Sequence, residues 1–249
     1  MYKIATLGSQ FDNMEHFVRT TYQDHPRPIL FWDTCALLDL LRHLARVEAI
    51  DNSLIYQDIS KIYSKIKWGK IYSVSSSVNS KEWDDNVDAA ITLLSNNLPK
   101  VLDWSRMIIE AKNKLENTNE NLPMINIENI KNHIVNMATT IVKKTIFLDV
   151  DKDVAYNALT RVTNKRPPSN AAKSSKAEFK DCSIWEVMLE LCRKTNATGI
   201  VKPKLFYTIN TDDFCTKDIG KPFDRVLLSE AATLSFVCCK TPNEVISHL

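Results

Sequence analysis

Blocks of apolar and polar residues alternate along the chain in a way that predicts an α/β protein. The clearest block begins at Pro28 and runs through Ile29, Leu30, Phe31 and Trp32 without a charge, which is the pattern of a strand buried on both faces. Leucines then recur at helical spacing over 35–47. Further extended segments are predicted at 71–75, 144–150, 204–210 and 232–238.

The remaining apolar patterns predict helices. Their ranges are 14–20, 53–68, 153–162 and 179–191. The middle third, with helical patterns over 80–118 and 127–144, resembles an all-helical arm, and Pro99 should kink or divide its first helix. We therefore expect a single domain over 1–249 with a helical insertion at about 84–145.

Composition excludes several classes of protein. Of the 249 residues, 44% are hydrophobic and 25% are charged, as in ordinary soluble domains, and the net charge of +2 does not indicate a strongly basic nucleic-acid binder. No apolar run reaches the length of a membrane span, and the N-terminus lacks the apolar region of a signal peptide. We expect a cytoplasmic protein without membrane contacts.

The common cofactor and nucleophile motifs are missing. Four glycines are too few and too far apart for a dinucleotide-binding or P-loop motif, and neither H-E-x-x-H nor G-x-S-x-G occurs. The six cysteines form no C-x-x-C pair, so we expect most of them to be buried free thiols.

Four acids stand at the ends of predicted strands or the starts of predicted helices: Asp33, Glu82, Asp181 and Asp213. If the strands are parallel neighbours, their carboxyl ends converge on the edge where open α/β sheets bind ligands. Clustered carboxylates raise one another's pKa unless a cation compensates them, and hard oxygen donors suit Mg²⁺ or Mn²⁺. One or two such ions can activate water against a phosphodiester.

Simpler roles remain open for each acid. Asp33 could cap the helix that follows, although Thr34 is also a reasonable N-cap. Glu82 and Asp181 could be first-turn acids favoured by the helix dipole, and Asp213 could cap the following segment. Neighbouring acids could also replace the chosen ones, namely Asp84, Asp85 and Asp212.

The segment 164–180 is predicted to be a long basic loop. It has no large aliphatic residue and only one acid, Glu178, and loops of this length are usually functional or disordered. We expect its cations to contact a phosphate backbone, with a solvated surface as the alternative. They are Lys165, Arg166, Lys173, Lys176 and Lys180.

The ordered set of motifs resembles PIN-like nucleases, in the branch with a strand ending in D-T and then V-x-x-x-E, K-D-x-x-x-W-E and T-x-N-x-x-D-F. The matching residues are Asp33-Thr34, Val78 through Glu82, Lys180-Asp181 with Trp185-Glu186, and Thr208, Asn210 and Asp213-Phe214. Arg161 followed by Pro167 resembles the segment before the third acid. The resemblance covers roughly 28–82 and 150–237. Many PIN domains carry an acid where Asn210 stands here, which makes the fourth ligand less certain than the first three.

This resemblance implies a three-layer α/β/α fold around a twisted parallel sheet and metal-dependent cleavage of RNA or structured DNA, with RNA preferred. Asp33, Glu82 and Asp181 would hold an ion that orients water, and Asp213 would ligate a second ion or a bridging water. The supporting residues would be Thr34, Thr208 and Asn210.

Two other functions stay open: a catalytically silent PIN-like module that binds RNA or a protein, and an interaction protein that works through its helical arm. A homo-oligomer or a regulatory protein partner also stays open. Because Asp212 and Asp213 are adjacent in a segment that we expect to be extended, their side chains should point to opposite sides, so only one should face the cleft. Phe214 should turn into the core and orient Asp213 inward.

Overall fold

A six-stranded sheet forms the centre of the protein, and all its neighbouring strands are parallel. The computed structural model describes residues 11–43, 52–121, 123–169 and 175–249. The strand order is β1-β4-β3-β2-β5-β6. The strands are β1 (Phe11–Asp12), β2 (Ile29–Trp32), β3 (Tyr72–Ser76), β4 (Thr145–Leu148), β5 (Lys204–Tyr207) and β6 (Val237–Cys239).

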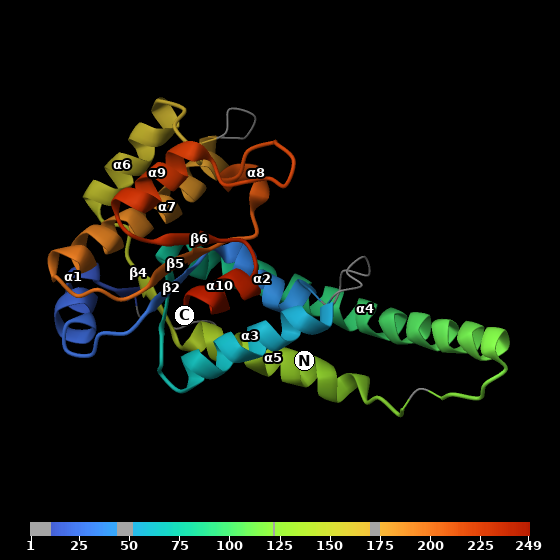
Figure 1. The fold of residues 1–249 in the computed structure, drawn as a ribbon. Helices are drawn as coiled ribbons and strands as arrows, with labels where there is room; N and C mark the ends of the chain where they lie inside the picture. The colour runs from blue at the N-terminus through green and yellow to red at the C-terminus, as the bar shows by residue number, and fades with distance from the viewer. Residues whose placement is uncertain (1–10, 44–51, 122, 170–174) are drawn as a thin grey trace.

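Helices cover both faces of this sheet (Figure 1). On one face lie α2 (Thr34–Arg42), α3 (Asn52–Lys67), the first half of α4 (Ser77–Glu116), α5 (Ile127–Lys143) and α10 (Pro242–His248). On the other lie α1 (Met14–His16), η1 (Phe17–Tyr22), α6 (Lys152–Thr163), α7 (Ser175–Ala197) and α9 (Arg225–Thr233). The short α8 (Thr211–Phe214) follows β5. Within the residues that the structure describes, no helix is long and apolar enough to cross a membrane.

Strand β2 explains why both faces need covering. Its side chains alternate between the faces, as the two-residue period of a strand requires. Leu30 and Trp32 belong to the core that holds α2, α3 and α5, whereas Ile29 and Phe31 belong to the core that holds α7 and α9. All four are fully buried. The prediction of a strand buried on both faces is confirmed.

Two predicted elements are wrong at their boundaries. The expected strand 232–238 is instead the end of α9 followed by β6, because Leu227 and Ala231 are buried at helical spacing. A short apolar run does not distinguish a strand from a buried helix. The expected loop 164–180 ends at Ser175, where α7 begins with residues that favour helices.

Helix α4 continues through Pro99, so of the two expected effects of this proline, a kink or a division, the division is wrong. Leu94 and Leu98 are buried just before the proline, and this packing stabilises the turns that Pro99 weakens. The second half of α4 projects from the body of the protein, and α5 returns beside it (Figure 1). Residues 44–47 of the predicted helix 35–47 lie outside the described residues.

The six cysteines are free thiols. Three of them are buried and three are half-buried, so the expectation of buried thiols holds in full only for Cys182, Cys192 and Cys239.

Candidate functional site

The three strands that precede Asp33, Glu82 and Asp213 are neighbours. β2 pairs with β3 on one side and with β5 on the other, with Trp32 beside Ser75 and Tyr207. The carboxyl ends of these strands therefore lie together, and the backbone N–H of Asp33 donates to the carbonyl of Tyr207 at 3.0 Å. The predicted convergence of these strand ends is confirmed.

Asp33 carries a buried carboxylate just after the end of β2. Only 2% of the residue is exposed, and the Thr208 hydroxyl donates to its Oδ2 at 2.7 Å. The pKa of Asp33 is raised to about 6, chiefly by burial and also by the negative charges of Glu82 and Asp213, against the Thr208 and Thr34 hydrogen bonds that lower it. Glu82 and Asp213, two other predicted site residues, thus lie near enough to interact electrostatically with this carboxylate.

The alternative that Asp33 caps the following helix is borne out in position but not in hydrogen bonding. Asp33 is the N-cap residue of α2, yet its side chain makes no N-cap hydrogen bond. The other candidate for the cap, Thr34, is the first residue of α2, and its hydroxyl donates to Asn79 Oδ1 at 2.6 Å. Of the two suggested caps, Thr34 is therefore wrong by one residue.

Asn79 connects the elements of the site by hydrogen bonds, although no sequence motif indicated this residue. This fully buried amide donates to the carbonyl of Trp32 at 2.9 Å and to the hydroxyl of Ser75 at 2.8 Å. It joins the end of β2, the end of β3 and the start of α2, and so fixes the first turn of α4 one turn before Glu82. The signal that the sequence offered for this role was an asparagine three residues before the candidate acid Glu82.

Glu82 lies in the second turn of α4, not at the helix start, and the first turn of α4 contains no acid. The helix-dipole explanation for Glu82 is therefore wrong. Its Oε1 lies 2.9 Å from Nζ of Lys180, the residue before Asp181. A cation from α7 thus already lies against this acid.

Asp181 does not open its helix as predicted, because α7 begins six residues earlier and Glu178 is the acid of its first turn. Burial raises the pKa of the Cys35 thiol, and the charges of Asp33, Glu82 and Asp181 contribute to the same rise. Asp181 therefore lies near enough to the first turn of α2 to share an electrostatic environment with the other two acids.

Asp213 and Asp212 point in opposite directions. Asp213 is 7% exposed and its Oδ2 accepts from the Asn210 amide at 2.6 Å. Asp212 is exposed and lies 3.5 Å from Lys221 Nζ. Phe214 is fully buried, so the predicted orientation is confirmed, but the segment is the helix α8 and not an extended strand as we expected. Asp213 lies in the first turn of α8, so its position also fits the simpler role of an acid that stabilises this turn.

The donor chemistry of this edge fits a hard divalent cation, but a finished metal site is not assembled. In 11–43, 52–121, 123–169 and 175–249, no group of three His, Cys, Asp or Glu side chains is arranged so that it could hold a metal ion. The four acids offer only oxygen donors, as Mg²⁺ and Mn²⁺ prefer. Of the substitutes, Asp84 is half-buried and Asp85 is exposed.

The cations of the predicted basic loop mostly pair with acids. Lys165 Nζ lies 3.2 Å from Glu178, Arg166 pairs with Glu230, and Lys180 pairs with Glu82. Lys173 lies outside the described residues, and so does the side chain of Lys176. Lys165 and Arg166 remain more than half exposed, so they can still contact a ligand.

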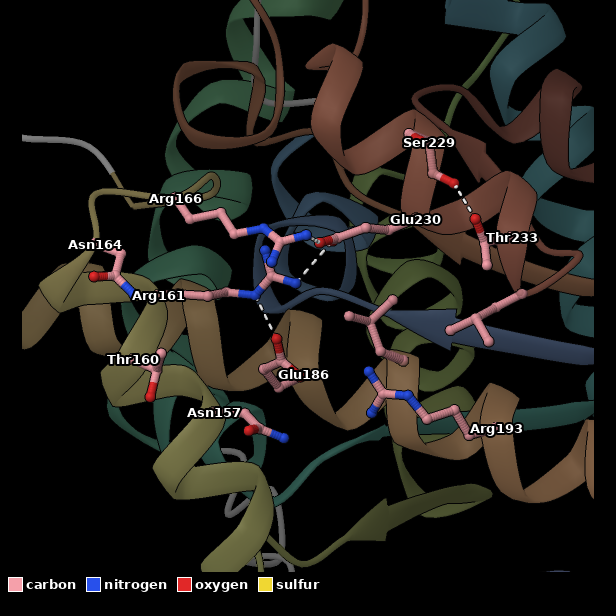
Figure 2. Close-up of a pocket in the computed structure, with 12 residues that line it drawn as sticks. Asn157, Thr160, Arg161, Asn164, Arg166, Glu186, Arg193, Ser229, Glu230 and Thr233 are labelled. Carbon is pink, nitrogen blue, oxygen red and sulfur yellow. Dashed lines mark hydrogen bonds and ion pairs between the residues drawn. The ribbon is translucent and has the colours of Figure 1, made fainter.

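Arg161, in α6, binds α7 through its ion pair with Glu186. The guanidinium of this buried residue pairs with Glu186 and Glu230 and donates to the carbonyl of Pro167 at 2.6 Å (Figure 2). Trp185 Nε1 donates to the same Glu230 oxygen at 2.7 Å. Arg161, Glu186 and Glu230 border a cavity of about 510 Å³ between α6, α7 and α9. Arg161, Pro167, Trp185 and Glu186 were part of the motif pattern, whereas Glu230 was missed because it is distant in sequence.

We expect Arg161→Ala to lower the free energy of unfolding by about 3–5 kcal/mol, because it leaves the buried Glu186 without its cation and removes one of the two guanidinium groups that pair with Glu230. Denaturant unfolding measures this change. Arg193→Ala is the matched control at the same cavity, because Arg193 forms an exposed pair with Glu190 and should cost less than about 1 kcal/mol. Equal losses in the two variants would contradict the anchoring role.

Comparison with known proteins finds no matching family model, no similar curated protein and no similar solved structure. The functional argument therefore depends on the residues themselves.

Proposed function

We propose that this chain is a PIN-like, divalent-metal-dependent nuclease that cleaves phosphodiester bonds, with RNA as its substrate. The observation that carries the proposal is the adjacency of β3, β2 and β5, which places Glu82 and Asp213 around the buried carboxylate of Asp33. Helices on both sides of a parallel sheet are compatible with the three-layer fold of that family.

In this proposal Asp33, Glu82, Asp181 and Asp213 hold Mg²⁺ or Mn²⁺. The bound ion would supply activated water and stabilise charge on the leaving oxygen. Thr208 holds the carboxylate of Asp33, and Asn210 holds that of Asp213 as a neutral partner. Lys165, Arg166 and Lys180 border the start of α7 and would contact phosphates of the strand.

A second candidate is a catalytically silent PIN-like module that binds RNA or a protein. The ion pair between Lys180 and Glu82 favours it, because an ammonium group there partly neutralises the acids without a metal. The two candidates differ in whether the acids bind a divalent ion and whether RNA is cleaved.

Thermal unfolding with increasing Mn²⁺ or Mg²⁺ tests the ion site. A ligand that binds only the folded state stabilises it, so we expect the melting temperature of the wild type to rise by about 5–10 °C at a hundredfold excess over Kd. Asp181→Asn should abolish the rise, whereas the exposed Asp212→Asn should keep it. Cleavage of single-stranded RNA by the wild type in the same buffer then separates the nuclease from the silent module. A melting temperature that the ions leave unchanged would contradict the proposed metal site.

A further inference from the structure

The projecting half of α4 carries an apolar stripe on its surface. Trp104 is 60% exposed, Met107 66%, Ile108 65% and Leu115 86%. Together with Ala111, Trp104, Ile108 and Leu115 follow the spacing 4-3-4, which places them on one face of a helix. Apolar surface of this extent on a soluble protein marks an interaction site.

The opposite face of the same helix is already covered. Residues from the returning segment lie there: Pro123, Met124 and Ile125 line a hollow together with Leu102 and Arg106. The Asn113 side chain also bonds the backbone of Glu120 in both directions, at 2.8 and 2.9 Å. Residues 102, 106, 109 and 113 precede the stripe by two positions, or about 200° around the helix. The stripe therefore faces away from the chain's own returning segment.

We propose that this stripe is a homodimer interface, in which the projecting half of α4 packs antiparallel against the same helix of a second copy. The 4-3-4 spacing reads the same in both directions. An antiparallel partner therefore places Trp104 opposite Leu115 of the second copy and Ile108 opposite Ala111, each pair occurring twice. Large side chains meet smaller ones in every layer, which is the complementarity that close packing requires.

Charge and area also fit a second copy. In this register Asp103 lies within two residues of the level of Lys114 of the second copy, on the same flank of the stripe, so two interchain ion pairs can form. Asp103 is exposed and pairs within its own chain with Arg106 on the next turn, at 3.0 Å. The stripe presents on the order of 500 Å² per copy, so a dimer buries on the order of 1,000 Å², the lower level for a specific interface.

The shape of the molecule leaves room for this arrangement. The second half of α4 extends beyond the sheet and its covering helices (Figure 1). In the proposed register the end of the second copy's α4 reaches the level of Asp103, short of the turn at Leu98 where α4 becomes buried in the body. The overlap of 103–116 spans about 20 Å.

Sedimentation velocity of the full chain at about 1–100 μM tests the proposal, a concentration range suited to the weak, reversible association that small interfaces commonly give. We expect a reversible dimer. Ile108→Asp, which changes both copies at once, should raise the dissociation constant at least tenfold. Val201→Asp is the control, since Val201 is 93% exposed and lies outside α4.

Charge exchange tests the antiparallel register. Asp103→Lys alone and Lys114→Asp alone should each weaken the dimer several-fold, and the double exchange should restore it. A chain that stays monomeric throughout, or a dimer that Ile108→Asp leaves unchanged, overturns the interface. A monomer whose binding to single-stranded RNA is lost in Ile108→Asp would assign the stripe to nucleic acid and equally overturn it. None of these outcomes depends on whether the acids bind a metal.

Discussion

Asp33→Asn should abolish metal-dependent cleavage of RNA while making the protein more stable at pH 8. Loss of activity should exceed about 100-fold, because even residues that only support a metal ligand cost 10–100-fold when changed. Asparagine keeps an oxygen that can accept from Thr208 but carries no charge beside Glu82 and Asp213.

The expected stability follows from the pKa of Asp33, which burial raises from 3.8 to about 6. A raised carboxyl pKa means that the folded state prefers the protonated form. The associated stability is present below about pH 4 and is lost as the pH rises through about 6. A rise of this size corresponds to about 3 kcal/mol, so Asp33→Asn should be more stable than the wild type at pH 8 by about 1–3 kcal/mol, and equal to it near pH 4.

Denaturant unfolding at the two pH values, without divalent ions, measures this difference. Asp212→Asn serves as control, because Asp212 is exposed and its loss should leave stability unchanged within about 0.5 kcal/mol. If Asp33→Asn is less stable than the wild type at pH 8, Asp33 has a structural role in place of the proposed one. If it cleaves RNA at the wild-type rate, the site assignment is wrong.

The centre of the sheet could be predicted from sequence because burial determines its composition. An uncharged apolar run such as 28–32 can only lie inside, and the two-residue alternation then requires covering on both faces. The neighbours of β2 were less constrained, since a parallel sheet is assembled from segments far apart in the chain. Their adjacency was a condition of the argument about the acids, and the structure satisfies it.

The positions of Glu82 and Asp181 within their helices could not be derived in the same way. Helix starts are determined by caps and early turns, and both helices begin before the residues from which we predicted them. Glu230 was missed for a different reason. It meets Arg161, Arg166 and Trp185 only after α9 packs on α7, and no local pattern records that contact.

The second large expected effect concerns Asp213, the candidate acid after β5. Its neighbour Asp212 is the same residue type and differs in the direction of its side chain, so the two make a matched comparison. Asp213→Ala should reduce single-turnover cleavage at saturating Mn²⁺ by at least about 100-fold, as expected for a direct ligand. Asp212→Ala should stay within about twofold, because its carboxylate faces solvent beside Lys221. Asn210→Ala should fall between them, since it removes the 2.6 Å hydrogen bond that orients Asp213 but no ligand.

Stability separates this role from a purely structural role as a first-turn acid of α8. A first-turn role would make Asp213→Ala cost about 0.3–1 kcal/mol of unfolding free energy with or without Mn²⁺. A ligand to the ion instead makes the deficit grow as Mn²⁺ is added, because only the wild type gains from binding. Unfolding of Asp213→Ala and Asp212→Ala, each with and without Mn²⁺, therefore decides between the two roles. A deficit for Asp213→Ala that Mn²⁺ leaves unchanged would assign Asp213 to stabilising the first turn of α8 and leave at most Asp33, Glu82 and Asp181 for the ion.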